Sequence, residues 1–154
     1  WITEGGADLM AIRALAAVDP TYDPRDQLQG EVNDCITLAA GGSLASAGTR
    51  GEHRAYYACG AVFALAAEAA QRRHDGGDWF DFLRPLLDSN RDDGVLTRAE
   101  WLAAMTTAAG DAEPARLIAR LLDDGAGEPV PVLAALFDRT GVAYRVDDGT
   151  LILL

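Results

Sequence analysis

Apolar and polar residues follow one another along most of this chain with the period of an α-helix. Alanine and leucine recur at intervals of three and four residues, and β-branched alternation is confined to the C-terminal end. The pattern predicts helices over residues 3–18, 24–40, 52–73, 78–87, 97–109, 113–123 and 130–139. Two strands, residues 143–146 and 150–154, are expected to flank a turn at Asp147-Asp148-Gly149. The predicted fold is mainly α: a single helical domain over residues 1–154, with about seven helices and a short C-terminal β-hairpin.

Local signals mark where several of these helices begin and end. Asp19-Pro20 stops the first helix, and Pro24 opens the second because proline is tolerated in a first turn. Thr97 and Glu100 have the spacing of a capping box. Residues 41–51 are rich in glycine, serine and alanine, so we expect a flexible link there.

The third predicted helix carries the longest apolar stretch of the chain. Residues 55–67 are almost uninterruptedly apolar and are followed by Glu68. A helix needs about 20 apolar residues to cross a bilayer, so this stretch is too short for a membrane span. We expect a buried helix.

Composition and charge narrow the classes of function. The 154 residues include 13 basic and 24 acidic side chains, a net charge of −11, and two histidines. A chain with this negative net charge repels phosphate groups. The charge therefore argues against nucleic-acid binding and against attachment to an anionic membrane surface. With 49% hydrophobic and 24% charged residues, the composition is that of a globular protein.

Two adjacent glycines, Gly5 and Gly6, stand in the first turn of a predicted helix. Each costs about 1 kcal/mol relative to alanine there, and close approach of another backbone is the usual reason for such a pair. Glu4 lies beside them, and Asp8 follows one turn later on the same face. These carboxylates either complement the helix N-terminus in solvent or belong to a functional site.

The residues around the glycine pair resemble a known motif. Residues 1–7, Trp-Ile-Thr-Glu-Gly-Gly-Ala, are similar to the Trp-x-x-Glu-Gly-x-Ala of gluzincin zinc metallopeptidases, the group that contains aminopeptidase N and the glycyl aminopeptidases. The resemblance implies that Glu4 is the third protein ligand of a catalytic zinc. It also implies that Gly5 lets its helix approach the metal-bearing helix and that Trp1 packs behind the site.

A second motif resembles the same group. Tyr57-Ala58-Cys59-Gly60 is similar to its Tyr-x-x-Gly, which also stands at the start of an apolar helix. The resemblance implies that the Tyr57 hydroxyl stabilises the oxyanion formed when zinc-bound water attacks the peptide carbonyl. Cys59 stands where the family often has lysine, which indicates a divergent branch. Neighbouring Tyr56 points about 100° away, so at most one of the two tyrosines faces a site; the alternative is that both are core aromatics.

The chain lacks the rest of the catalytic centre that the resemblance requires. A gluzincin holds zinc with two histidines of a His-Glu-x-x-His motif, whose glutamate is the general base, and this sequence has no such motif. We expect His53 in an exposed first turn and His74 at a helix C-terminus. The sequence therefore predicts the C-terminal fragment of a larger metallopeptidase, with the zinc-binding histidines roughly two dozen residues before Trp1.

This hypothesis also defines cofactor and partners. We expect the full-length parent to bind zinc. The fragment alone is expected to bind no zinc and to be inactive. Its partners are the N-terminal catalytic portion of the same chain and, through the parent, a peptide substrate. From another class of function, the alternative is a non-catalytic acidic helical interaction module.

A degenerate calcium loop at residues 88–100 is a minor option within that alternative. Asp88, Asn90 and Asp92 have the spacing of the first ligands of an EF-hand, but the glycine and Glu100 then fall one place late. We expect an acidic turn leading into a capped helix instead.

Two cysteines, Cys35 and Cys59, fall in predicted helices on either side of the glycine-rich link. Antiparallel packing of these helices can bring them together. They form a disulfide if the parent is exported, for instance to a periplasm, and stay buried thiols if it is cytosolic. The sequence leaves both open.

Overall fold

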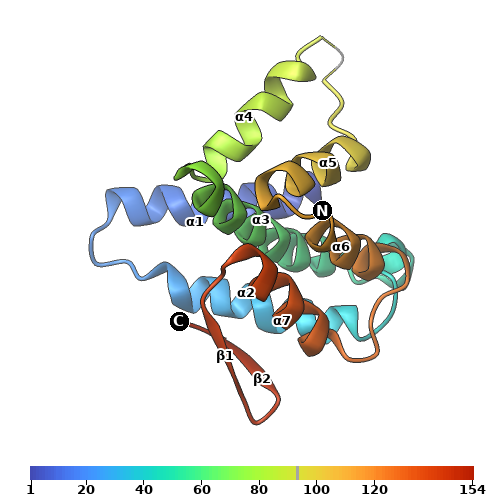
Figure 1. Cartoon of the computed structure of the whole chain (residues 1–154). Coiled ribbons are helices and arrows are strands. Elements are labelled where there is room, and N and C mark those ends of the chain that lie inside the picture. Colours follow the sequence, from blue (N-terminus) through green and yellow to red (C-terminus); the bar gives the residue numbers. More distant parts are fainter. Residues whose placement is uncertain (93) are drawn as a thin grey trace.

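The computed structural model describes residues 1–92 and 94–154, and it confirms the mainly helical fold (Figure 1). Helical elements in chain order are α1 (Ile2–Val18), α2 (Pro24–Ala39), the 3₁₀ helix η1 (Leu44–Arg50), α3 (Arg54–Asp75), α4 (Trp79–Ser89), α5 (Arg98–Ala109), α6 (Glu113–Asp123) and α7 (Pro129–Thr140). Strands β1 (Tyr144–Asp147) and β2 (Thr150–Leu153) follow. Every predicted helix and strand is present, and no bound differs by more than two residues.

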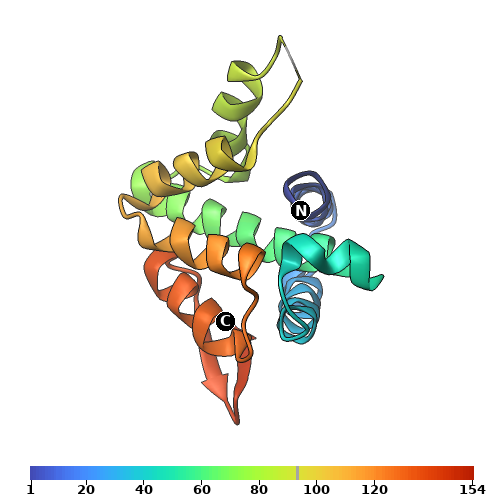
Figure 2. The ribbon, with the colours of Figure 1, turned by 90° about the vertical axis from the view of Figure 1, so that its right-hand side faces the viewer.

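Helix α3 is the centre of the core. Every residue from 58 to 70 is buried, as the long apolar stretch predicted. Figure 2 shows α1 and α2 nearly end-on while α3 runs across the view, so α3 crosses both. The C-terminal end of α4 projects from one end of the molecule and the hairpin from the other. Among the described residues, no helix is long and apolar enough to cross a membrane.

Aromatic side chains join α4 and α5 to this core. Trp79 and Phe82 of α4 stack with their ring centroids 5.5 Å apart, and the Phe82 ring meets Trp101 of α5 edge-on at 5.4 Å. All three side chains are at most 3% exposed. Asp78 caps α4 by accepting hydrogen bonds from the backbone N–H groups of the first turn.

The segment expected to be a flexible link, residues 41–51, contains η1. Its Leu44 and Ala47 side chains are fully buried. The Arg50 guanidinium donates to the carbonyl oxygen of Ser43 at 2.8 Å, which closes the turn. The expectation of flexibility was wrong because the segment contributes apolar side chains to the core and satisfies its own backbone groups.

The C-terminal hairpin has the predicted turn. Tyr144 pairs with Leu153 and Asp147 with Thr150, which leaves a two-residue loop. Asp148 and Gly149 both have positive φ, 45° and 77°, as expected for an Asp-Gly turn of the type that matches strand twist.

The side chain of Gln29 on α2 fastens this hairpin to the helices. Its Nε2 donates to the Leu151 carbonyl at 2.8 Å, and its Oε1 accepts from the Leu153 N–H at 2.8 Å. Both backbone groups lie on the edge of β2 that faces away from β1, since these two residues belong to the non-hydrogen-bonded pairs of the ladder.

A disulfide joins α2 to α3. Cys35 and Cys59 are bonded, with their Cα atoms 4.6 Å apart, and both residues are fully buried. Of the two arrangements that the sequence left open, the structure has the bridged one. The bridge lies one residue before Gly60 and so holds α2 against the part of α3 that carries the tyrosine motif.

We expect loss of this bridge to lower the free energy of unfolding by about 3 kcal/mol, because the cross-link closes a loop of 24 residues in the unfolded chain. The Cys35→Ala/Cys59→Ala variant and the native chain in dithiothreitol should both show the loss in urea titrations, whereas dithiothreitol should leave the variant unchanged. Two free thiols per native chain, counted under denaturing and non-reducing conditions, would contradict the bridge.

Candidate functional site

Helices α1 and α3 meet backbone to backbone at Gly5 and Gly60. A Cβ atom added to Gly5 would lie 2.0 Å from the carbonyl carbon of Gly60, and one added to Gly60 would lie 2.3 Å from the carbonyl oxygen of Trp1. Glycine is therefore required at both positions. The close approach that the glycine pair predicted is confirmed.

The structure also gives each glycine of the pair a specific neighbour. Gly5 is occupied by α3, so it does not serve the approach of an upstream helix that the family resemblance implied. Gly6 lies under the indole of Trp79, whose Cζ2 would be 3.1 Å from an added Cβ. One glycine thus admits a helix backbone and the other admits an aromatic ring.

The crossing brings together the two motifs singled out in the sequence. Glu4 immediately precedes Gly5, and Tyr57 lies one turn before Gly60. Neither side chain points into the core: that of Glu4 is 40% exposed and Tyr57 is 41% exposed. Two segments far apart in the sequence thus place an acid and a phenol near one helix crossing.

Tyr56 and Tyr57 have different surroundings, as their angular separation predicted. The Tyr56 hydroxyl accepts a hydrogen bond from the Gly48 N–H at 3.0 Å and so fixes η1 to α3. Within the described part of the chain, the Tyr57 hydroxyl has no hydrogen-bond partner. Tyr56 is a structural residue, and Tyr57 is the tyrosine that is open to a ligand.

An ion-pair cluster around Arg54 connects α1, α2 and α3 near the crossing. The Arg54 guanidinium donates to Glu31 at 2.6 Å and Asp34 at 3.0 Å on α2, and it pairs with Asp8 on α1 at 3.5 Å. The hydrogen bond to Glu31 is the main reason that the pKa of Arg54 is raised. Glu31 is buried, and its carboxylate pairs with Arg54 there.

The same cluster connects the helix faces that carry Glu4 and Tyr57. Asp8 follows Glu4 by one helical turn, and Arg54 precedes Tyr57 by one turn, so each pair shares a helix face. The Asp8–Arg54 ion pair therefore joins the face of α1 that carries Glu4 to the face of α3 that carries Tyr57.

Sequence reasoning missed this cluster. Its three acids are 20 to 46 positions from Arg54, and nothing in the local pattern pairs them with it. The one available signal was the position of Arg54, three residues before Tyr57 on a predicted helix.

Glu4 carries a charge suited to a metal ligand. Its Oε2 accepts a hydrogen bond from the Trp1 nitrogen at 3.0 Å. Hydrogen bonding by its own backbone N–H is the main reason that the pKa of the Glu4 carboxyl is lowered. The carboxylate is therefore ionised at neutral pH, which is the form that binds a metal ion.

Trp1 lies behind Glu4 against the core. Its ring meets Phe63 of α3 edge-on at 5.7 Å and Trp101 of α5 at 5.0 Å. The indole therefore anchors the first turn of α1 to two other helices, which limits the movement of Glu4.

Within the described residues, no three His, Cys, Asp or Glu side chains are grouped so that they could hold a metal ion. His53 and His74 are exposed at opposite ends of α3, as expected, and neither lies in the first turn of α1. The described residues therefore supply no histidine beside Glu4.

The loop considered as an EF-hand uses its polar side chains in other ways. Asn90 Nδ2 donates to the carbonyl of Leu86 at 2.8 Å, and Arg91 pairs with Asp88 at 2.6 Å. Glu100 accepts from the Thr97 N–H at 2.8 Å, which confirms the predicted capping box. Asp92 is exposed, and Asp93 lies outside the described residues.

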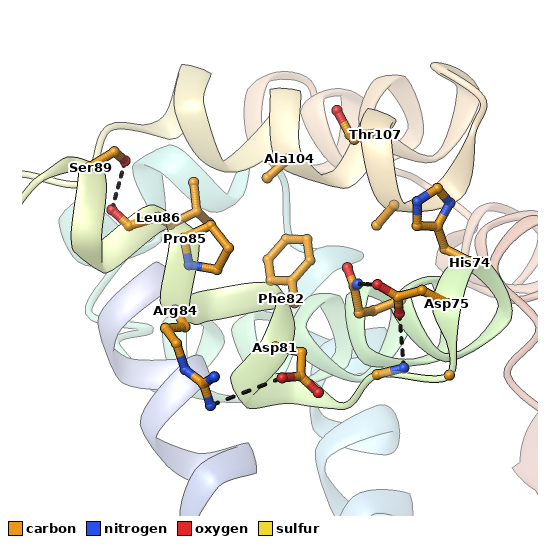
Figure 3. Close-up of a pocket in the computed structure, with 14 residues that line it drawn as sticks. His74, Asp75, Asp81, Phe82, Arg84, Pro85, Leu86, Ser89, Ala104 and Thr107 are labelled. Carbon is orange, nitrogen blue, oxygen red and sulfur yellow. Dashed lines mark hydrogen bonds and ion pairs between the residues drawn. The ribbon is translucent and has the colours of Figure 1, made fainter.

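A cleft of about 890 Å³ lies apart from the crossing, between the end of α3, α4 and α5. Figure 3 shows Phe82 within it, Asp75 and Asp81 on one side, and Thr107 opposite. The Asp75 carboxylate accepts a hydrogen bond from the Gly77 N–H at 2.9 Å, and the Asp81 carboxylate accepts one from the Asp78 N–H at 3.1 Å. These acids serve the turn between α3 and α4, so we assign no chemistry to the cleft.

Comparison with protein-family models, with curated protein sequences and with solved structures gave no match.

Proposed function

We propose that this chain is the C-terminal helical portion of a zinc-dependent, aminopeptidase-like peptidase. In this proposal Glu4 is a zinc ligand and Tyr57 stabilises the oxyanion. The observation that carries it is the α1–α3 crossing, where the glycines of two separately recognised motifs are in direct contact. A pair of unrelated chance matches has no reason to share one contact.

The geometry supports different roles for Glu4 and Tyr57. Glu4 presents an ionised, half-exposed carboxylate from a helix turn fixed by Trp1. Tyr57 presents a hydroxyl that has no partner within the described chain and can donate to a developing oxyanion. Zinc, held by Glu4 and by two histidines from outside these residues, would polarise the substrate carbonyl and activate water.

The crossing also explains why the spacing of Glu4 and Tyr57 is well defined. Gly5 and Gly60 set the distance between the two helix axes, and the Asp8–Arg54 pair limits their rotation. Donors aimed at a transition state are effective only when they are held in place beforehand. The general base is not among these residues and belongs to the upstream portion.

Metal content tests the role of Glu4. In the longer protein that includes the residues preceding Trp1, Glu4→Gln should reduce zinc well below one ion per chain, because the amide binds zinc poorly. Asp26→Asn is the matched control: it removes an exposed carboxylate from the first turn of α2 and should leave zinc content unchanged. Equal zinc in the two variants would refute the assignment.

The upstream reading frame tests the parent class. An in-frame His-Glu-x-x-His before Trp1 is expected. Its absence would leave the acidic helical interaction module as the function of this chain.

A further inference from the structure

Helix α4 and the turn that ends it carry their charged residues along one exposed stripe. The charged residues from position 79 to position 91 are Asp81, Arg84, Asp88 and Arg91. Their spacing of three, four and three positions is the one that keeps residues on the same face of a helix. All four side chains are exposed, by 47–78%. We call these four residues the α4 charge stripe.

The α4 charge stripe is complementary to itself when it is reversed. Asp81 and Arg91 lie five residues on either side of Leu86, and Arg84 and Asp88 lie two residues on either side of it. A second α4, laid antiparallel about a two-fold axis at the level of Leu86, therefore sets each charge opposite one of the other sign. Because the symmetry repeats every pair, four opposite-charge pairs form and no like charges face each other.

The apolar residues beside the α4 charge stripe agree with the same register. Phe80, Leu83 and Leu87 lie on its flank toward α1 and, together with Met10, line a groove of about 380 Å³. Phe80 is 41% and Leu87 54% exposed. In the register that the charges define, Leu87 of the second copy lies at the level of Pro85, midway between Leu83 and Leu87 of the first. An apolar side chain thus reaches the open groove, as a knob enters a hole between packed helices.

The contacts within one molecule leave this face of α4 accessible. Arg91 pairs with Asp88 at 2.6 Å and Arg84 with Asp81 at 4.0 Å. Exposed pairs of this kind contribute little to stability, so a facing helix can take over their partners at small cost. The C-terminal end of α4 projects from the molecule (Figures 1 and 2), and an antiparallel second copy would place the rest of its chain beyond that end.

We infer that α4 is a dimerisation helix, through which two copies of this chain pair antiparallel about a two-fold axis at Leu86. A partner with a uniformly charged helix would match only half of the α4 charge stripe, whereas α4 itself has the required alternation. The helix has 11 residues and is about 16 Å long. Contacts of this small size are typical of reversible association. The inference does not depend on the proposed function.

Sedimentation velocity of the 154-residue chain over a concentration series tests the inference. The native chain should show a reversible monomer–dimer equilibrium. Arg84→Asp should raise the dissociation constant of the dimer at least about tenfold, because two symmetry-related attractions become repulsions. Asp88→Arg should do the same for the same reason. The double variant Arg84→Asp/Asp88→Arg, which keeps the net charge of the chain, should restore the dimer.

Mixing the two single variants separates pairing between molecules from effects within one helix. In Arg84→Asp both positions 84 and 88 are acidic, and in Asp88→Arg both are basic. An equimolar mixture should therefore form a heterodimer about as stable as the native dimer, although each variant alone dimerises poorly. The changed side chains are exposed, and circular dichroism checks that each variant is folded.

A second pair of variants tests the apolar part of the contact. Leu87→Ser should also weaken the dimer, because it removes the side chain that enters the groove of the other copy. Val146→Ser is the matched control: Val146 of β1 is 51% exposed, close to the value for Leu87, and lies outside the contact. Its replacement should leave the dissociation constant unchanged.

Three results would overturn the inference. The first is a native chain that stays monomeric up to about 1 mM, beyond which association is too weak to be specific. The second is a dimer that neither Arg84→Asp nor Leu87→Ser weakens, because its contact must then lie elsewhere. The third is a pair of single variants that fail to associate when mixed, because the antiparallel register requires their charges to attract.

Discussion

Replacing Gly60 with alanine is expected to lower the free energy of unfolding by about 3 kcal/mol or more, equivalent to a fall in Tm of about 6–12 °C. The added Cβ would lie 2.3 Å from the Trp1 carbonyl oxygen and 2.9 Å from the Gly5 Cα. Both atoms belong to the backbone, so α1 and α3 must separate along their whole contact. Gly5→Ala should have an effect of similar size for the same reason. Urea titration monitored by circular dichroism measures the change.

Gly30 offers a matched control for that experiment. It lies inside α2, is exposed, and an added Cβ would meet no atom within 4 Å. Gly30→Ala should therefore stabilise the chain by about 0.5–1 kcal/mol, because alanine is the better helix former. A loss of less than 1 kcal/mol for Gly60→Ala would show that the two helices do not meet as described.

In the longer protein that the proposed function requires, Tyr57→Phe is expected to lower kcat for peptide hydrolysis about 10²–10³-fold while KM and Tm stay close to their original values. Tyr57 is 41% exposed and its hydroxyl has no hydrogen-bond partner in the described chain, so removal of the hydroxyl should leave the fold intact. The loss falls on kcat because the proposed hydrogen bond forms only when the carbonyl oxygen becomes an oxyanion. Steady-state kinetics with an aminoacyl or peptide amide measures it.

Tyr56→Phe is the control for this variant, because it removes the same group from the neighbouring residue. The Tyr56 hydroxyl holds the Gly48 N–H, so its loss should cost about 1 kcal/mol of stability and leave kcat unchanged. Similar kcat values for the two variants would contradict the assignment of Tyr57. A lower Tm for Tyr57→Phe alone would show that this hydroxyl has a structural partner instead.

The helices were predictable because their signals are local. The capping box of Thr97 and Glu100, the buried stretch after Ala55 and the Asp-Gly turn each depend on residues a few positions apart. Such patterns determine the backbone whichever way the chain packs. Segment 41–51 was misjudged because composition does not show that Leu44 and Ala47 would be needed in the core.

The candidate site was predictable only in part. The cost of Gly5 and Gly6 in a helix showed that a backbone or ring must come close, but the identity of the neighbour depends on tertiary packing. Gly60 and Trp79 take these places. The Arg54 cluster and the pairing of Cys35 with Cys59 likewise join residues from different helices, and no periodicity along one segment contains that information.

Gln29 shows how this small protein protects the exposed border of its hairpin. The open edge of a two-stranded ribbon offers unpaired N–H and C=O groups to any extended chain it meets. By bonding the Leu151 carbonyl and the Leu153 N–H, the carboxamide takes the places of the N–H and the C=O that an added strand would direct at these two groups. A side chain on a helix thereby blocks the growth of the sheet, and Gln29→Ala would expose a nucleus for intermolecular strand pairing and aggregation.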